Sequence, residues 1–217
     1  QEQELNQERL RFYTNITHEL RTPLTLILGP LEDMQKDTSL PTRQAQKLSV
    51  IHQSALRLLN LINQILEFRK TETQNKKLCV CKSNIAPLVH EIGLKYKELN
   101  QKKAIDFQIQ IEKEEMLLFF DKEIITIILD NLISNAIKYT EQGKITLSLY
   151  PTTRNGVTYT EIKVSDTGYG ISAEALPHVF DRYYQESGKH QASGTGIGLA
   201  LVKNLVTLHE GEIRAES

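Results

Sequence analysis

The sequence predicts two domains, an all-α helical hairpin over residues 1–72 followed by an α+β sandwich over residues 73–217. Apolar residues recur at helical spacing through residues 1–70, which carry almost no strand signal. Beyond residue 78 the pattern alternates between strand-like and helix-like segments. A chain of 217 residues also has room for two modest domains.

Composition indicates an ordinary globular protein. The 26 basic residues nearly balance the 27 acidic ones and are scattered, so we expect no nucleic-acid partner. The only cysteines, Cys79 and Cys81, are too close in sequence to staple a fold, and they favour reduced thiols in a cytoplasmic setting over a metal site. Residues 1–11 lack the apolar core of a secretory signal, and no apolar run could span a bilayer, so we expect no membrane contact within this segment.

The hairpin is predicted from two amphipathic helices separated by a polar break at residues 37–41, which supplies capping residues and Pro41. The apolar positions are Leu20, Leu24, Ile27, Leu28, Leu31 and Met34 in the first helix and Leu48, Ile51, Ala55, Leu58, Ile62 and Ile65 in the second. An isolated hairpin leaves part of this apolar stripe exposed, and a second copy would cover it in a four-helix bundle. We therefore expect a homodimer.

The second domain is predicted to be mixed. Alternation begins at Leu78, and helices fit residues 85–101, 122–139 and 198–209. Strands fit residues 105–111, 116–120, 144–150 and 158–165, the last two joined by an Asn-Gly turn at residues 154–156. Helices on one face of a mostly antiparallel sheet make an α+β sandwich.

His18 is the first candidate for chemistry. It lies beside Glu19 and one helical turn before Thr22, so His18 and Thr22 share a face. Imidazole titrates near neutrality, and a neighbouring carboxylate can hold the neutral nucleophilic tautomer and stabilise its developing positive charge. The alternative is a surface histidine in a polar helix, with Pro23 acting only as a helix bend.

A second candidate is the polar face of the helix over residues 122–139. Asn131, Asn135 and Lys138 are spaced by four and three residues and share this face. Amide oxygens suit Mg²⁺, and a lysine can offset phosphate charge. The alternative is a solvated helix face, although asparagine is an unfavourable residue inside a helix.

Two glycine loops complete the candidates, at residues 166–171 and 194–199. Glycine allows the backbone to approach a ligand closely, and a helix N-terminus favours phosphate. Each loop alone could be a plain turn. Neither follows the P-loop or the Rossmann pattern, so a different nucleotide-binding fold is needed.

Taken in order, these segments resemble the sensor histidine kinase family of two-component signalling. Residues 18–24 resemble its H-box, 131–140 its N-box, 166–171 its first glycine box, 180–185 its F-box and 194–199 its second glycine box. The resemblance covers nearly the whole chain. It implies a dimeric four-helix bundle followed by an α+β sandwich of the histidine kinase, gyrase and Hsp90 ATPase type, and a membrane-bound hybrid sensor as the source.

The resemblance also implies a reaction. His18 would accept the γ-phosphoryl group of ATP and pass it to an aspartate of a response-regulator receiver domain. Glu19 would orient the imidazole and accept its proton, and Thr22 would position water for a phosphatase activity towards the same partner. Such a chain would be the cytoplasmic segment of an inner-membrane sensor.

ATP and Mg²⁺ are the cofactors that the resemblance implies. Mg²⁺ would be held by Asn135 with Asn131, phosphate by Lys138 and Arg182, and adenine by Asp166 and Tyr139. The glycine boxes would supply close approach and the hinge of a lid over residues 185–193, through Gly168, Gly170, Gly194, Thr195, Gly196 and Gly198. The hinge between the domains would lie at residues 71–77.

One departure and two rival functions remain. The ATP domain of the family continues beyond residues 212–217 into a further strand, so we expect this chain to be C-terminally truncated, with an unpaired sheet edge. A degenerate dimeric scaffold is disfavoured because every motif residue is present. An ATP-driven clamp of the same nucleotide fold would have no use for the His18 hairpin.

Overall fold

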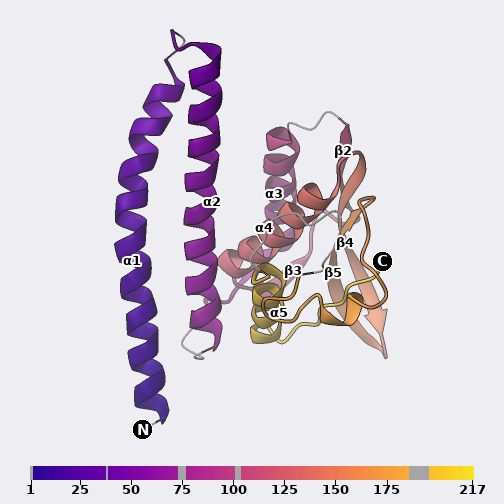
Figure 1. Ribbon diagram of the computed structural model, residues 1–217. Helices are drawn as coiled ribbons and strands as arrows, with labels where there is room; N and C mark the ends of the chain where they lie inside the picture. The colour runs from indigo at the N-terminus through magenta and orange to yellow at the C-terminus, as the bar shows by residue number, and fades with distance from the viewer. Residues whose placement is uncertain (1, 38, 73–76, 101–103, 186–195) are drawn as a thin grey trace. The chain divides into compact units, whose positions relative to one another are not determined.

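The computed structural model describes residues 2–37, 39–72, 77–100, 104–185 and 196–217 (Figure 1). It divides into two compact units, Gln1–Lys76 and Lys77–Ser217. We refer to them as the hairpin unit and the mixed unit. This agrees with the predicted fold class of a helical hairpin followed by an α+β sandwich.

The hairpin unit consists of two long helices, α1 (Glu2–Gln35) and α2 (Thr42–Glu72), which lie side by side in opposite directions (Figure 1). Leu24 and Leu28 of α1 pack with Ala55 and Ile62 of α2 to form a narrow core. Helix α1 continues through Pro23 and Pro30. The prediction of two helices is confirmed.

The turn between the helices is held by local hydrogen bonds. The Asp37 carboxylate accepts bonds from the hydroxyl and the backbone N–H of Ser39, which hold the pKa of Asp37 below its ordinary value. The carbonyl of Pro41 accepts hydrogen bonds from the backbone N–H groups of Gln44 and Ala45, and these bonds form the first turn of α2. The polar break therefore supplies the capping groups that its composition predicts.

Among its described residues, the mixed unit contains two small sheets, three α-helices and one 3₁₀ turn. In chain order the elements are β1 (Cys81–Asn84), α3 (Ile85–Leu99), β2 (Ile105–Ile111), β3 (Leu117–Phe120), α4 (Lys122–Tyr139), β4 (Gly143–Arg154), β5 (Val157–Asp166), η1 (Leu176–His178) and α5 (Gly198–Leu208). Strands β1 and β3 pair antiparallel, and the second sheet has the order β2-β4-β5. Within it β4 and β5 are antiparallel, but β2 and β4 are parallel, because the chain returns through β3 and α4 between them.

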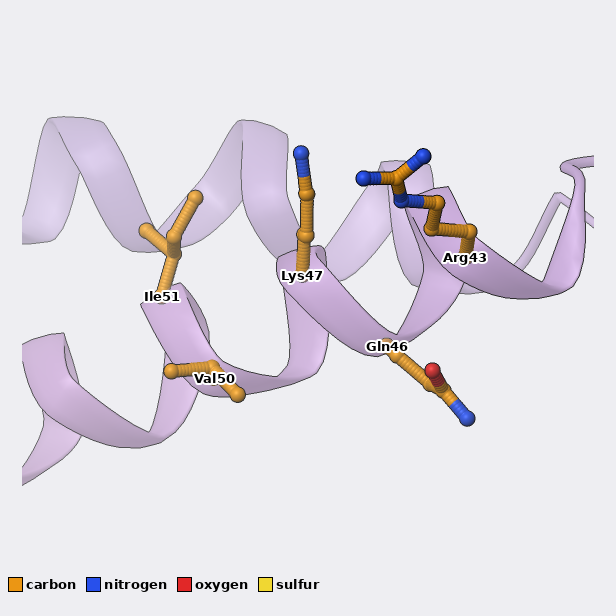
Figure 2. Close-up of a pocket in the computed structure, with 5 residues that line it drawn as sticks. All are labelled: Arg43, Gln46, Lys47, Val50 and Ile51. Carbon is orange, nitrogen blue, oxygen red and sulfur yellow. The ribbon is translucent and has the colours of Figure 1, made fainter.

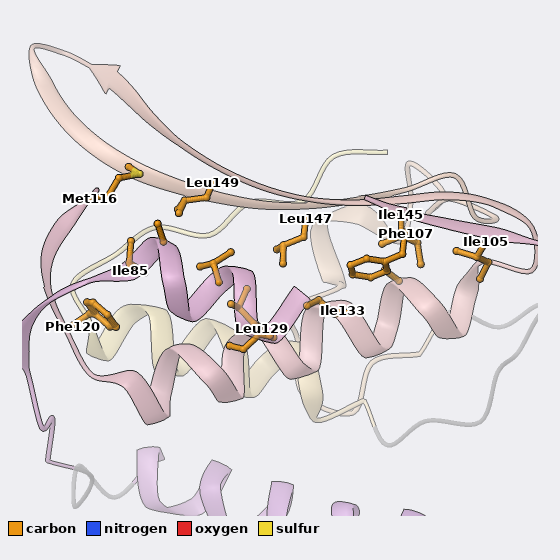
Figure 3. Packing of buried hydrophobic residues seen from close by; sticks show 14 residues of the cluster. Ile85, Ile105, Phe107, Met116, Phe120, Leu129, Ile133, Ile145, Leu147 and Leu149 are labelled. Atoms are coloured by element: carbon orange, nitrogen blue, oxygen red, sulfur yellow. The ribbon is translucent and has the colours of Figure 1, made fainter. Parts of the chain in front are cut away.

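The core of the mixed unit lies between one face of the β2-β4-β5 sheet and the helices α3 and α4 (Figure 3). Ile145, Leu147 and Leu149 alternate along β4 and are fully buried. Leu129 and Ile133, one turn apart on α4, point towards them and are also fully buried (Figure 3). This packing fixes which face of α4 is turned away from the sheet.

The β4–β5 turn has positive φ angles at both central residues, 50° at Asn155 and 79° at Gly156. Such a turn matches the twist of an antiparallel hairpin, as the Asn-Gly sequence predicts. Residues 211–217 are neither helix nor strand. They are tied to the rest of the unit by an ion pair between Arg214 and Glu161 (3.3 Å) and by a bond from the N–H of Ile171 to the Ser217 hydroxyl (2.8 Å).

Candidate functional site

His18 lies on α1 with its side chain exposed, and Glu19 beside it is exposed as well. The Thr22 hydroxyl donates a hydrogen bond to the carbonyl oxygen of His18 (3.1 Å), so the two residues share one helical face. One turn away, the Arg21 guanidinium donates to the Asn63 amide oxygen (2.6 Å) and ties α1 to α2. The imidazole is therefore presented outwards from a braced stretch of helix.

Pro23 changes the backbone next to His18. Proline has no N–H, so the carbonyl of Glu19 lacks the donor that it would have in a regular helix. The Thr22 hydroxyl is already engaged with the His18 carbonyl. The hydroxyl oxygen keeps its lone pairs, so it can accept a hydrogen bond from a water molecule, as the resemblance implies, while it donates to this carbonyl.

The polar face of α4 carries the two asparagines, but their environments differ. Asn131 is buried, and its amide nitrogen donates to the carbonyl of Ile127 in its own helix (2.8 Å). Asn135, one turn on, is only partly buried. Asn135 is therefore the more accessible of the two to a ligand.

Lys138 and Tyr139 end α4 and contact each other. The Lys138 ammonium donates to the Tyr139 hydroxyl (3.0 Å) and lies 4.6 Å from the centre of its ring. Tyr139 is 38% exposed. The ammonium carries three N–H donors, so it can bind a phosphate while it keeps the bond to Tyr139.

Asp166 ends β5 next to the last residues of α4. Its Oδ1 accepts the N–H of Gly168 (2.9 Å) and lies 3.5 Å from the hydroxyl of Thr140, which is fully buried. In the described part of the chain, Oδ2 of Asp166 accepts no hydrogen bond. The carboxylate is thus oriented through one oxygen while the other remains accessible to a donor.

The first glycine loop is joined to the end of α4. The N–H of Tyr169 donates to the carbonyl of Tyr139 (3.3 Å), and a Cβ at Gly168 would lie 2.4 Å from that same oxygen. Gly168 is therefore required by packing within the protein, whatever it does for a ligand. The Tyr169 hydroxyl bonds to Glu141, which raises the pKa of Tyr169.

The F-box and the second glycine loop are also joined. The N–H of Tyr183 donates to the carbonyl of Gly196 (2.9 Å), and Gly196 has a φ of 67°. A Cβ at Gly196 would lie 2.6 Å from the backbone of Tyr183, so only glycine fits. Arg182 beside this contact is exposed. Gly194, Thr195 and residues 186–193 of the expected lid lie outside the described residues.

Helix α5 begins at Gly198 and has no side-chain cap, since Ile197 occupies the capping position. The N–H groups of an uncapped first turn, together with the helix dipole, attract an anion. Gly170, in the first loop, has a φ of 73° that glycine tolerates.

The predicted site residues thus form two clusters within the mixed unit. One joins Asp166 and Gly168 to the end of α4, and the other joins the F-box to Gly196. Helix α4 contacts both β5 and α5, which brings the two clusters onto one scaffold. His18, Glu19 and Thr22 belong to the hairpin unit.

These groups fit a magnesium nucleotide. Asp166 offers an oriented acceptor for an amino group, and the start of α5 offers donors for phosphate. No cluster of three or more His, Cys, Asp or Glu side chains that could hold a metal occurs among the described residues. The amide oxygens of Asn131 and Asn135 are of the kind that suits Mg²⁺, together with oxygen atoms of a nucleotide.

Sequence reasoning missed Thr140 as a partner of Asp166. The two residues are 26 positions apart, and in the sequence Thr140 is only the last residue of the segment 131–140. Its place directly after the last residue of α4 was the one available signal.

A shallow groove also occurs on α2, lined by Arg43, Gln46, Lys47, Val50 and Ile51 (Figure 2). In Figure 2, Arg43, Lys47 and Ile51 project to the same side of the helix. The groove contains none of the candidate catalytic residues. No helix in the described parts of the chain is long and apolar enough to cross a membrane.

Comparison with known families matches both units. Residues 8–74 match the family described as His Kinase A (phospho-acceptor) domain. Residues 120–217 match the family described as histidine kinase-, DNA gyrase B- and HSP90-like ATPase.

Curated relatives match along almost the whole chain. Histidine kinase P4 of Formosa agariphila is 37% identical over 98% of this chain, which spans only 16% of that relative's length. Sensor histidine kinase YcbM of Bacillus subtilis is 33% identical over 97% of this chain, and the match covers 68% of YcbM. Among solved structures, full-length ShkA in complex with AMPPNP is 25% identical with a TM-score of 0.70, over 91% of this chain and 40% of ShkA.

Proposed function

This chain belongs to the sensor histidine kinase family, and from that premise we propose that it binds ATP in the mixed unit and transfers the γ-phosphoryl group to His18. The observation that carries the proposal is the exposed imidazole of His18 within the segment that matches the phospho-acceptor family. The second unit supplies acceptor and donor groups suited to a nucleotide.

His18 would act as the nucleophile. A neutral ring nitrogen attacks the γ-phosphorus, the bond from phosphorus to the bridging oxygen breaks, and ADP leaves with that electron pair. The other ring nitrogen loses its proton, and the adjacent Glu19 would orient the ring and accept that proton. Phosphoryl transfer depends mainly on alignment and charge neutralisation, so bringing the two units together is the main task.

The mixed unit would hold the nucleotide from both ends. Asp166 accepts the adenine amino group through Oδ2, and Tyr139 lies against the base. The first turn of α5 and Lys138 contact phosphate. The complex of full-length ShkA with AMPPNP supports binding of ATP, because AMPPNP is an ATP analogue.

Mg²⁺ would neutralise phosphate charge when bound, and Asn135 is the residue best placed to hold it. Asn131 is more buried than Asn135, and its amide oxygen would be the second ligand, because its amide nitrogen donates to its own helix. Arg182 would supply a further charge to phosphate. Gly194 and Thr195, with Gly196 and Gly198, would form the lid hinge that the family resemblance implies.

We also propose that two hairpin units pair. Besides the buried core, α1 exposes Leu20, Ile27 and Met34, and α2 exposes Ile51, Leu58 and Ile65, in both cases at intervals of seven residues. We call these six residues the outer stripe. A seven-residue repeat is the pattern of helices that pack along a continuous seam.

The two halves of the outer stripe lie on one face of the hairpin. On each helix, viewed from its N-terminus, the outer-stripe positions are offset about the helix axis in the same direction from the buried core positions. Because the two helices are antiparallel, this offset places both halves of the stripe on the same side of the hairpin. The Arg21–Asn63 bond (2.6 Å) and the contact between His52 and Glu32 (3.6 Å) show which residues of α1 lie opposite which residues of α2. In this register Leu20 lies beside Ile65, Ile27 beside Leu58, and Met34 beside Ile51, a continuous apolar face that a second hairpin would cover.

Onward transfer to a receiver aspartate and removal of phosphate with the help of Thr22 complete the proposal. Phosphohistidine is a reactive carrier, and the relatives are sensor kinases. We propose that this segment, with its unit boundary near residues 72–77, acts on the cytoplasmic side of a longer sensor.

Incubation with Mg²⁺ and γ-labelled ATP tests the reaction. We expect acid-labile, base-stable label on the protein, no label in His18→Gln, and strongly reduced label in Asn135→Ala. His90→Gln is the matched control, because His90 is exposed on α3 and lies outside the residues 8–74 that match the phospho-acceptor family. Full labelling of His18→Gln would overturn the proposal, and ATP hydrolysis without any protein label would favour the clamp.

A further inference from the structure

Asp121 is the point where three segments of the mixed unit meet. It caps the N-terminus of α4, where its Oδ1 accepts the N–H groups of Glu123 (3.0 Å) and Ile124 (3.2 Å). Its Oδ2 accepts the N–H of Cys79 (2.8 Å), in the segment that enters the unit. Its own N–H donates to Nε2 of His209 (3.0 Å), at the end of α5.

The Asp121 side chain at this junction is buried, and its hydrogen bonds favour the charged form of the carboxylate. Asp121 is only 5% exposed, and burial by itself would raise its pKa. The hydrogen bonds from Cys79, Ile124 and Glu123 outweigh burial and hold the pKa of Asp121 below its ordinary value. Nε2 of His209 accepts this hydrogen bond through its lone pair.

The junction lies at the opposite end of the helices from the nucleotide groups. Asn135 is about 20 Å farther along α4 at a rise of 1.5 Å per residue. The uncapped first turn of α5 is about 16 Å from His209 by the same measure. The junction is therefore separate from the groups that we assign to the nucleotide.

Cys79, in contrast, lies just after the boundary between the two units at Lys76 and Lys77. The junction fixes where the connecting chain leaves the mixed unit and ties that exit to the two helices that carry nucleotide-binding groups. Transfer between groups on separate units depends on how often they meet in the right orientation, and a fixed exit point limits the orientations sampled.

We propose that Asp121 and His209 are positioning residues, which set the orientation in which the mixed unit reaches His18. The proposal rests on the proposed phosphoryl transfer. It assigns these residues to the transfer step and not to nucleotide binding.

The test compares His209→Leu, His209→Gln and the wild-type chain, with His90→Leu on the exposed face of α3 as control. We expect His209→Leu to lower the maximal autophosphorylation rate about fivefold or more while KM for ATP stays within about twofold. Glutamine can accept the Asp121 N–H through its side-chain oxygen, so His209→Gln should recover most of the rate. Hydrogen exchange at the Cys79 amide should increase in His209→Leu and return towards wild type in His209→Gln.

Three results would overturn the proposal: an unchanged rate in His209→Leu, a loss of rate matched by a rise in KM, or no recovery in His209→Gln when thermal unfolding shows both variants folded. A labelled wild type with an unaffected His209→Leu refutes the positioning role alone. A wild type without label refutes the proposed function itself.

Discussion

The two units bury their apolar residues in different ways. The mixed unit has a two-layer core in which Leu129, Ile133 and Leu147 are fully buried. The hairpin unit has only a narrow core, and residues such as Ile27 and Leu58 are about half exposed, at 50% and 49%. One unit completes its core within a single chain, whereas the other leaves an apolar face exposed, which we propose that a second copy covers.

This difference separates two kinds of stability. Unfolding of the mixed unit is expected to be independent of protein concentration, because its core is made by one chain. The hairpin unit should become more stable as concentration rises, because pairing adds buried surface. The proposed phosphoacceptor thus lies on the unit that we expect to depend on association, and the proposed nucleotide-binding groups lie on the unit that we expect not to.

The largest expected effect comes from Leu58→Glu in the outer stripe. Each copy loses the burial of one leucine, worth about 1.5–3 kcal/mol, and a symmetric dimer loses two, or about 3–6 kcal/mol. Sedimentation equilibrium should show a monomer where the parent chain is a dimer. The matched control is Leu56→Glu, which is 42% exposed but lies off the stripe. Equal association of the two variants would contradict the proposed face.

Leu129→Ala should have the next largest effect. Truncating this fully buried side chain should lower the free energy of unfolding of the mixed unit by about 2–5 kcal/mol. Urea unfolding at two protein concentrations is the measurement, and the loss should be the same at both. A loss that varies with concentration would mean that the mixed unit also depends on association.

A smaller, pH-dependent effect is expected at Asp121. Its folded-state pKa is lowered, so its contribution to stability is complete above about pH 4 and is lost as the pH falls through the lower folded-state value. Asp121→Asn loses the bond from Cys79 and should cost about 1–3 kcal/mol at pH 6. The difference from wild type should shrink at pH 3.

Urea unfolding at the two pH values measures this effect, with Glu174→Gln as the control that removes an exposed carboxylate. A constant difference between wild type and Asp121→Asn from pH 6 to pH 3 would show that the carboxylate charge has no part in the junction.

Much of the fold was predictable from local patterns. The helix over residues 122–139 and the strand over 105–111 match α4 and β2 residue for residue, because hydrophobic periodicity and capping are local signals. The Asn-Gly turn was predictable for the same reason. The order of the motifs carried the family resemblance, which no single loop could establish.

What was not predictable depends on contacts distant in sequence. The inward turn of Asn131 and the pairing of Lys138 with Tyr139 depend on how α4 is rotated against the sheet. The bond between Asp121 and His209 spans 88 positions and leaves no local pattern. The parallel pairing of β2 with β4 likewise follows from the crossover through α4 and not from strand composition.

The most direct test of the central claim is to locate the phosphoryl group by tandem mass spectrometry after incubation with Mg²⁺ and ATP, with the digest kept at alkaline pH. The account predicts one phosphoryl group per chain on the peptide that contains His18, with fragment ions that place it on the imidazole. A phosphoryl group on His52 or on a hydroxyl side chain, with His18 unmodified, would contradict the account.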